Sequence, residues 1–313
     1  MAEGDSPTIA RLRVRLAVRE AREASGLTQA DVAEAMEWSN SKVIRIENGD
    51  NTISINDLKG LLTLLGVTDK DHIDALLADA RVARRRQQPV KAWWQEPRFR
   101  EQMTDDLRRF VEYEAEASEI RSYNILYVPG PLQTPEYATA LTRMWQDERS
   151  ESESPRRGGF SQEKVAALVE ARRLRREGML SRLDSLKYLI LFDESVLLRP
   201  AGGPAVFAAQ LQQIVELSAR GMFRLRMLPF DLGTAIANNG TFDLLKVGTD
   251  RAGSEVMYRE NGPHDEMVEN RDETARHRNR FDQLWEVARN EGDTIAFIEE
   301  RRAIFLGAES PNL

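Results

Sequence analysis

The sequence contains no cysteine, few histidines and no long hydrophobic run. Its 313 residues include three histidines and no cysteine. The missing thiols exclude disulfide bonds and thiolate zinc sites. No apolar stretch reaches the roughly 18 residues that a transmembrane helix needs, so we expect no membrane contact. The first residues, MAEGDSPTIA, lack a basic segment followed by an apolar one, and we therefore expect no secretory signal and a cytoplasmic protein.

An excess of positive charge is also missing. The formal net charge is −7, and residues 1–88 hold 13 basic and 14 acidic side chains. A nucleic-acid-binding domain usually carries a basic footprint. Any phosphate contact made by this part of the chain must therefore come from a local cluster of side chains.

Motifs for catalysis and metal binding are absent as well. The chain has no Gly-x-Ser-x-Gly motif, no Walker loop and no Gly-x-Gly-x-x-Gly. None of His72, His264 and His277 is followed by a second candidate ligand three or four residues later. Asp193 ends the apolar run LKYLILF, where α/β enzymes place catalytic carboxylates, but it can equally cap the next helix. We therefore expect no enzymatic activity, no cofactor and no metal.

The length and a break in the pattern predict two domains. A chain of 313 residues exceeds one average domain, and 41% hydrophobic with 30% charged residues is typical of globular proteins. Gln87-Gln88-Pro89 interrupts the helical periodicity after the basic run at residues 84–86. We place an N-terminal domain at residues 1–86, a linker at 87–98 and a second domain at 99–313.

Helical periodicity and capping residues predict an all-α N-terminal domain. Ile9, Leu12 and Leu16 recur at helical spacing, and Thr28 precedes Asp31 by three residues in a variant of the capping box. Five short helices are predicted, over residues 9–24, 28–36, 40–48, 58–65 and 69–86.

The helix predicted at residues 40–48 has two different faces. A rotation of about 100° per residue places Val43, Ile46 and Glu47 on one side. On the other side, Asn and Arg side chains suit the edges of adenine and guanine, and Ile suits a thymine methyl group. An ordinary amphipathic helix in a small bundle is the alternative interpretation. The outward side chains are Asn40, Ser41, Ile44, Arg45 and Asn48.

The segment LTQADVAEAMEWSNSKVIRIENG favours DNA binding over that alternative. It resembles the helix-turn-helix of phage-repressor/Cro-like regulators, the XRE family, with Thr28-Gln29, Ala33, Glu47 and Gly49 in register. The resemblance implies a five-helix Cro/repressor-like domain in a sequence-specific transcriptional regulator located at the nucleoid. Such proteins bind double-stranded DNA as homodimers, on palindromic operators whose half-sites lie roughly 34–36 Å apart.

The resemblance also assigns roles to individual residues. Gln29 and Asn48 would contact phosphates, Lys42 would lean towards the DNA backbone, and Arg22 would form a partly buried ion pair with Glu47. Glu37 departs from the family, because many relatives have glycine where the turn needs a left-handed backbone. The expected DNA-contacting residues are Thr28, Gln29, Ser39, Asn40, Ser41, Lys42, Ile44, Arg45 and Asn48.

Apolar runs that alternate with helical stretches predict an α/β second domain. The spacing of the last two runs is too short for a helical crossover, so we expect a mixed sheet. Strands are predicted at residues 120–128, 186–192, 222–228, 241–247 and 255–260, and helices at 99–117, 135–146, 160–180, 204–219 and 265–289.

The second domain resembles the companion domain of WhiJ-like transcriptional regulators of actinomycetes. YVPGPLQTPEYATALTRMW, VEARRLRREGML and FRLRMLPFDLGTAIANNGTFDLLKV carry this resemblance. It implies a signal-sensing, dimerisation or partner-binding domain. The alternative function is an antitoxin-like module that holds a small acidic partner protein, with DNA binding serving autoregulation.

A few residues of the second domain carry further predictions. Arg172, Arg173 and Arg176 belong to a basic stripe that is either a solvated helix face or the contact for an acidic partner. Pro129-Gly130-Pro131 is either the rim of a pocket or a rigid corner. The pair Trp93-Trp94 should pack on the first helix of the second domain or at a dimer seam.

Overall fold

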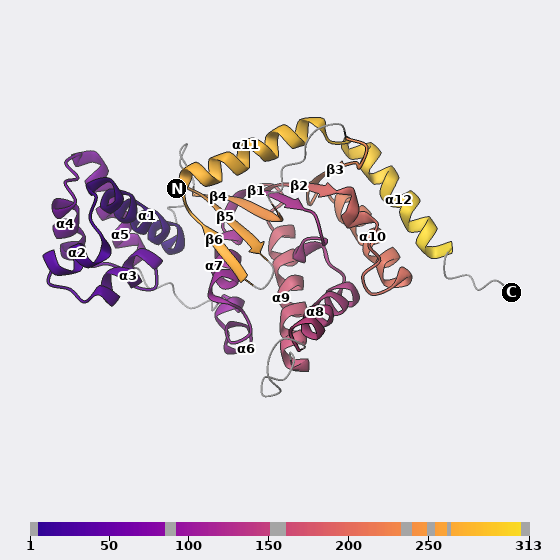
Figure 1. Ribbon diagram of the computed structural model, residues 1–313, viewed down its shortest axis with the longest axis horizontal. Coiled ribbons are helices and arrows are strands. Elements are labelled where there is room, and N and C mark those ends of the chain that lie inside the picture. Colours follow the sequence, from indigo (N-terminus) through magenta and orange to yellow (C-terminus); the bar gives the residue numbers. More distant parts are fainter. Residues whose placement is uncertain are drawn as a thin grey trace. The chain divides into compact units, whose positions relative to one another are not determined.

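The computed structural model describes residues 6–84, 92–150, 161–232, 240–248, 254–261 and 264–307. The chain divides into two compact units, one of residues 1–90 with 247–254 and the other of residues 91–246 with 255–313. The predicted fold class is confirmed, because a helical unit is followed by a unit with a mixed six-stranded sheet and helices (Figure 1). No helix within the described ranges is long and apolar enough to cross a membrane.

All five helices predicted for the N-terminal unit are present. The fifth stops at Ala83, and the predicted continuation through residues 85 and 86 lies outside the described residues, as does the linker up to residue 91. The helices are α1 (Pro7–Ser25), α2 (Gln29–Ala35), α3 (Asn40–Asn48), α4 (Ile55–Leu64) and α5 (Lys70–Ala83).

Local capping explains where α2 and α3 begin and end. The Thr28 hydroxyl accepts a hydrogen bond from the Asp31 amide, and the Asp31 carboxylate accepts one from the Thr28 amide, which completes the predicted capping box. The Ser39 hydroxyl caps α3 by accepting a hydrogen bond from the Lys42 amide. Gly49 ends α3 at φ 82°, a left-handed conformation that glycine adopts without a steric penalty.

An apolar core fixes the orientation of α3. Val43 and Ile46 of α3 are 3% and 4% exposed and join one cluster with residues of the other four helices. Because each fully buried aliphatic side chain contributes about 1.5–3 kcal/mol, this packing holds one face of α3 inward. The other face is therefore left for solvent or for a partner.

The turn between α2 and α3 contains a strained residue. Glu37 has φ 55°, and it is the one positive-φ residue other than glycine in the described part of the chain. The Trp38 amide donates to the Ala33 carbonyl at 2.8 Å, so the backbone must turn back at this point. A left-handed conformation costs a residue with a Cβ about 1–2 kcal/mol. The doubt about this turn that Glu37 raised in the sequence is therefore resolved in favour of the left-handed form.

Replacing Glu37 with glycine should stabilise the helical unit. The substitution relieves the left-handed strain, and the larger unfolded-state entropy of glycine offsets part of the gain, so we expect a net increase of about 0.5–1 kcal/mol. Hydrogen exchange of the α2 and α3 amides measures the change. Glu37→Ala is the control, because alanine keeps the Cβ and the strain. An equal gain from both substitutions would trace the effect to the lost charge instead.

The second unit combines strands and helices. Part of the predicted linker already folds into η1 (Trp93–Gln95) and the start of α6 (Pro97–Arg100). The strands are β1 (Ala117–Asn124), β2 (Lys187–Asp193), β3 (Arg224–Leu228), β4 (Phe242–Val247), β5 (Ser254–Asn261) and β6 (His264–Val268). The other helices are α7 (Asp105–Glu114), η2 (Gly130–Leu132), α8 (Pro135–Ser150), α9 (Gln162–Leu180), η3 (Glu194–Leu197), α10 (Pro204–Ala219), α11 (Arg271–Val287) and α12 (Glu291–Gly307).

The strands form one sheet in the order β3-β2-β1-β4-β5-β6. The pairs β1–β2 and β2–β3 are parallel, with Ile120 opposite Tyr188 and Ile190 opposite Leu225. The pair β5–β6 is antiparallel, with Tyr258 opposite Met267. The sheet is therefore mixed, as the spacing of the last predicted strands indicates.

Two predicted helices of the second unit are wrong in extent, and one predicted strand is present with shifted ends. The predicted helix at 265–289 begins with strand β6, which pairs with β5, and α11 starts only after Asn270 caps it. The predicted helix at 99–117 is two helices, because the Thr104 hydroxyl caps α7 and starts a new helix. The first strand begins at Ala117, three residues before the predicted start. In addition, α12 has no counterpart among the predicted helices.

The two faces of the sheet differ in polarity. Tyr123, Leu189 and Phe242 pack on one face with Phe281 and Leu284 of α11. Because successive side chains of a strand point to opposite faces, the neighbours of these residues lie on the other face. Figure 1 shows α11 along one side of the sheet and α7 and α9 on the other. The second face presents Ser122, Asn124, Tyr188, Asp243, Tyr258 and Glu260 towards α7 and α9.

Candidate functional site

The outer face of α3 is the candidate nucleic-acid interface. The predicted phasing is confirmed, since Val43, Ile46 and Glu47 are buried. Lys42 and Asn48 are half-buried at the edges of this face. The exposed residues are Ser39, Asn40, Ser41, Ile44 and Arg45.

Arg45 and Ile44 are the largest side chains on this face. The Arg45 Nε donates to the Ser41 carbonyl at 3.2 Å, and within the described part of the chain the guanidinium has no carboxylate partner. Ile44 is 36% exposed, which is high for an isoleucine. A guanidinium and an aliphatic group side by side can read guanine and the thymine methyl group.

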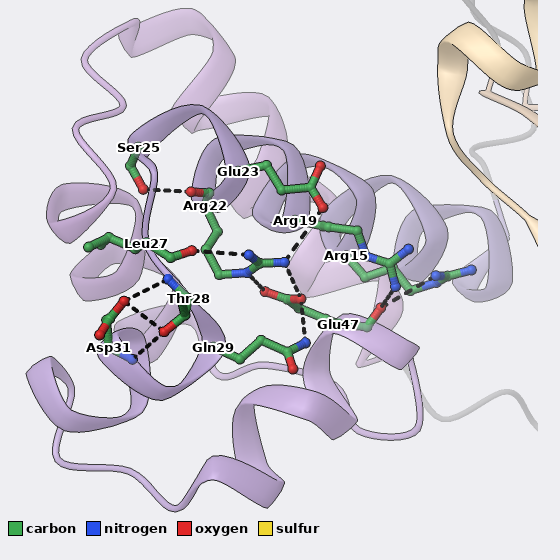
Figure 2. A network of polar contacts seen from close by, with 10 residues as sticks. All are labelled: Arg15, Arg19, Arg22, Glu23, Ser25, Leu27, Thr28, Gln29, Asp31 and Glu47. Atoms are coloured by element: carbon green, nitrogen blue, oxygen red, sulfur yellow. Dashed lines mark hydrogen bonds and ion pairs between the residues drawn. The ribbon is translucent and has the colours of Figure 1, made fainter.

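A buried ion pair holds α3 against α1 (Figure 2). The Arg22 guanidinium donates two hydrogen bonds to the Glu47 carboxylate, with Nε–Oε1 at 2.6 Å and Nη2–Oε2 at 3.0 Å. Glu47 is 1% exposed. Its hydrogen bond to Glu47 raises the pKa of Arg22, although burial opposes the shift. The pair is charge-assisted and bidentate, which fixes the angle between the two helices.

Two further arginines of α1 reinforce this connection. Arg19 Nη2 donates to the Glu47 carbonyl at 3.0 Å, and Arg15 Nη1 lies 3.4 Å from the same oxygen. That carbonyl belongs to the last turn of α3, where backbone acceptors lack helical partners. The arginines therefore cap the C-terminal end of α3 and hold it in place.

Gln29 belongs to the same network. Its Nε2 donates to Glu47 Oε2 at 2.8 Å, so the start of α2 is attached to α3 through this carboxylate (Figure 2). Thr28 uses its hydroxyl and amide in the capping box. The phosphate contact of Gln29 and the DNA contact of Thr28 stay predictions, and in this structure both side chains organise the helix-turn-helix.

Lys42 is also engaged within the protein. Its Nζ lies 3.0 Å from Asp57 Oδ2 and 3.8 Å from the centre of the Trp38 ring. Both members of the ion pair are 35% exposed, so DNA phosphate can compete with Asp57 for the ammonium group. Its contact with the DNA backbone stays a prediction.

The sequence patterns of known families agree with this geometry. Residues 14–76 match the family described as "Helix-turn-helix domain", which is XRE-like. Residues 107–300, well over half of the chain, match the family described as "Domain of unknown function (DUF5753)". The chain belongs to the DUF5753 family. No curated protein and no solved structure matches it. An N-terminal helix-turn-helix of this kind suggests a DNA-binding regulator, with the DUF5753 domain as its second part.

The basic stripe of α9 in the DUF5753 domain is not a solvated face. Arg173 pairs with Glu170 and Glu177 on its own helix. Arg176 donates to the Gln133 carbonyl at 3.0 Å, and Arg172 donates to the Thr142 hydroxyl at 3.2 Å. The fourth arginine of the stripe, Arg175, forms a buried pair with Glu114. Contact of Arg172, Arg173 and Arg176 with an acidic partner stays a prediction, but each has a role within the domain.

Other residues singled out in the sequence have structural roles. The Asp193 carboxylate caps η3 by accepting from the Ser195 amide at 2.9 Å. Trp93 packs edge-on against Phe99, with ring centres 5.0 Å apart, near the start of the second unit. Among the residues that the structure describes, no group of three or more His, Asp and Glu side chains is arranged to hold a metal ion.

The DUF5753 domain contains a cavity of about 340 Å³ on the polar face of its sheet. Pro129 and Gly130 lie on its wall, and both predicted alternatives for this turn, a pocket rim and a rigid corner, agree with this position. The charged side chains of the cavity are Arg172, Arg175, Asp243, Glu260 and Asp265. Sequence reasoning named one of these, Arg172, as a site residue. The available signal was the single carboxylate inside the apolar strand TFDLLKV.

Proposed function

We propose that the chain is a sequence-specific DNA-binding transcriptional regulator that acts as a homodimer and carries the DUF5753 domain as its regulatory part. The observation that supports this most directly is the exposed face of α3, with Asn40, Ser41, Ile44 and Arg45, on a helix fixed from behind by Glu47. We extend the proposal to a WhiJ-like identity, a palindromic operator and a cytoplasmic location at the nucleoid. A binding role rather than catalysis is supported by Asp193, whose carboxylate is used as a helix cap.

Replacing Arg45 with alanine should weaken specific DNA binding. A bidentate contact from arginine to guanine contributes about 1–3 kcal/mol, so we expect roughly tenfold to hundredfold weaker binding to the operator. Gel-shift titration of the full chain on DNA from upstream of its own coding region measures this. Binding to random DNA should change much less, because the near-neutral helical unit has little non-specific attraction.

Arg81→Ala is the matched control for Arg45→Ala. Arg81 is exposed on α5, and its removal changes the net charge by the same amount. We expect Arg81→Ala to change operator binding by at most about 0.5 kcal/mol, as surface substitutions usually do. If Arg45→Ala has an equally small effect, then α3 does not read bases and the proposal fails at this step.

The homodimer is tested by the operator itself. Footprinting should show two protected half-sites roughly 34–36 Å apart along the DNA, one helical turn between centres. A single protected half-site, together with a monomer mass in sedimentation of the complex, would contradict dimeric binding.

An antitoxin-like module that holds a small acidic protein is the second candidate. Its proposed contacts are Arg172, Arg173 and Arg176, and their bonds inside the DUF5753 domain favour the regulator instead. Purification from a native lysate at low salt tests this candidate. It requires a stoichiometric acidic partner that is lost when Arg173, whose side chain is 42% exposed, is replaced by glutamate.

A further inference from the structure

The cavity of the DUF5753 domain has the dimensions and composition of a small-molecule site. Its volume of about 340 Å³ falls within the usual range of ligand pockets, roughly 300–1,000 Å³. Helices α7 and α9, with the turn before α7, contribute mainly apolar side chains. They include Met103, Leu107, Leu168 and Ala171, which belong to one hydrophobic cluster. The strands contribute polar side chains. A ligand that fills this space must therefore be apolar at one part and polar at another.

One of the charges at the cavity is neutralised within the protein. The Arg175 guanidinium forms two hydrogen bonds of 2.7 Å with the carboxylate of Glu114, which is 4% exposed. The pair is bidentate, and the negative charge of Glu114 balances the positive charge of Arg175. The charge of Arg175 is therefore largely balanced by Glu114, although Arg175 still acts to lower the pKa of Asp243.

The remaining charges on the cavity wall are mostly negative. Glu260 lies near Arg172, whereas Asp243 lies near Ser122 and Arg175. No ion pair joins Asp243, Glu260 and Arg172 in the described part of the chain. Asp265 adds a carboxylate that accepts a hydrogen bond from the Thr104 hydroxyl at 2.9 Å. Three carboxylates, those of Asp243, Glu260 and Asp265, thus stand against one arginine, Arg172. An added positive charge would balance the charge of the cavity.

The protein environment makes these carboxylates costly without a counter-charge. Burial raises the pKa of Asp243 to about 7, and burial also raises the pKa of Glu260. Asp243 is half-buried on the cavity wall, and Glu260 borders the cavity as an exposed residue. A bound cation would supply the stabilisation that water no longer provides.

We propose that this cavity binds a small organic cation, an amine or guanidine on an apolar body, whose charge is neutralised by Asp243 and Glu260 and whose body packs on the apolar side chains of α7 and α9. The binding site stands on its own geometry, and it rests on the proposed function only in the further step that makes this cation an effector of DNA binding.

A set of probes with one body and different charges tests the cation preference. Isothermal titration of the full chain, without DNA, is made with 2-phenylethylamine, 2-phenylethanol, phenylacetate and L-phenylalanine at pH 8. We expect the amine to bind at least about tenfold more tightly than the alcohol. Equal binding of amine and alcohol, tighter binding of the anion or the zwitterion, or no binding of the amine up to about 10 mM would each overturn the proposal.

Variants locate the binding site within the cavity. Asp243→Asn and Glu260→Gln keep the side-chain shape and remove one charge, so each should weaken amine binding about tenfold and change alcohol binding less than about threefold. These variants should fold, because each keeps the side-chain shape, Glu260 is exposed and Asp243 is only half-buried. Glu216→Gln is the matched control, since Glu216 is exposed on α10 and does not border the cavity. An effect of Glu216→Gln equal to that of the other two would place the amine elsewhere.

The pH dependence gives a second readout of the same contact. Asp243 loses its charge as the pH falls through about 7, so amine affinity should drop about tenfold between pH 8 and pH 6, while alcohol affinity stays constant. An amine affinity that does not change over this range would contradict pairing with Asp243. The groups that surround Asp243 and set this pH range are Ser122 of β1, Tyr188 of β2, Glu260 of β5, Glu114 of α7 and Arg175 of α9.

The experiments distinguish binding of the cation from its effect on DNA binding. If the amine binds but operator affinity in the gel shift is unchanged at saturating amine, the binding site stands and its role as an effector site fails. If the chain binds no operator at all, the titration without DNA still decides the cavity.

Discussion

Replacing Glu47 with alanine is expected to lower the free energy of unfolding of the helix-turn-helix unit by about 3–5 kcal/mol, because the substitution leaves the Arg22 guanidinium buried without its partner. Arg22 is 13% exposed, and both of its hydrogen bonds to carboxylate oxygens end on Glu47. The Gln29 amide would lose its acceptor at the same time. The side chains of Arg22 on α1 and Gln29 on α2 thus both bind to the Glu47 carboxylate of α3.

Hydrogen exchange of the full chain measures this loss for the helical unit alone. Amides of α1 and α3 should exchange faster by a factor equivalent to the lost stability, about tenfold for each 1.4 kcal/mol, while amides of the DUF5753 sheet keep their rates. Operator binding should fall as well, because the angle of α3 is no longer fixed.

Glu23→Ala is the matched control for Glu47→Ala. The Glu23 carboxylate lies 3.6 Å from the same arginine but is 58% exposed, so its removal should cost at most about 1 kcal/mol. The double variant Arg22→Met/Glu47→Leu removes both buried charges, and it should be more stable than Glu47→Ala. If Glu23→Ala and Glu47→Ala cost the same, burial does not decide the strength of this pair.

Local signals in the sequence were sufficient for the helix-turn-helix. Thr28, Ser39 and Gly49 each act within about one helical turn, so the ends of α2 and α3 follow from neighbouring residues. The inward face of α3 follows from helical periodicity. The role of Gln29 was harder to predict, because its partner Glu47 is 18 residues away and a glutamine amide serves equally for phosphate or carboxylate.

Long-range contacts explain what the sequence did not predict in the DUF5753 domain. The segment of β6 looks helical by itself and becomes a strand because β5 offers it an edge. Arg175 and Glu114 are 61 residues apart, so the stripe of α9 resembles a solvated face until α7 is placed beside it. The cavity is lined by residues of α7, of α9 and of the strands, so no single sequence motif predicts it. The signal for the cavity in the sequence is the occurrence of polar residues on one face of otherwise apolar strands.

Replacing Glu114 with alanine is expected to destabilise the DUF5753 domain by about 3–5 kcal/mol. Arg175 is 12% exposed, and although burial lowers its pKa, the charge and hydrogen bonds of Glu114 more than compensate and hold the pKa above its usual range. Without Glu114 the guanidinium stays buried and loses both bonds. Hydrogen exchange of the β1 and β2 amides measures the loss, and the amides of the helix-turn-helix should keep their rates.

Glu170→Ala provides the comparison on the same helix. Glu170 pairs with Arg173, which is 42% exposed and lies two residues before Arg175, so this loss should cost at most about 1 kcal/mol.

The loss of Glu114 should also change the ligand preference of the cavity, because Arg175 then adds an unbalanced positive charge there. We therefore expect Glu114→Ala to weaken the binding of 2-phenylethylamine more than that of 2-phenylethanol. Glu170→Ala should change the binding of neither compound. A loss of stability without this shift in preference would separate the Glu114–Arg175 pair from the charge balance of the cavity.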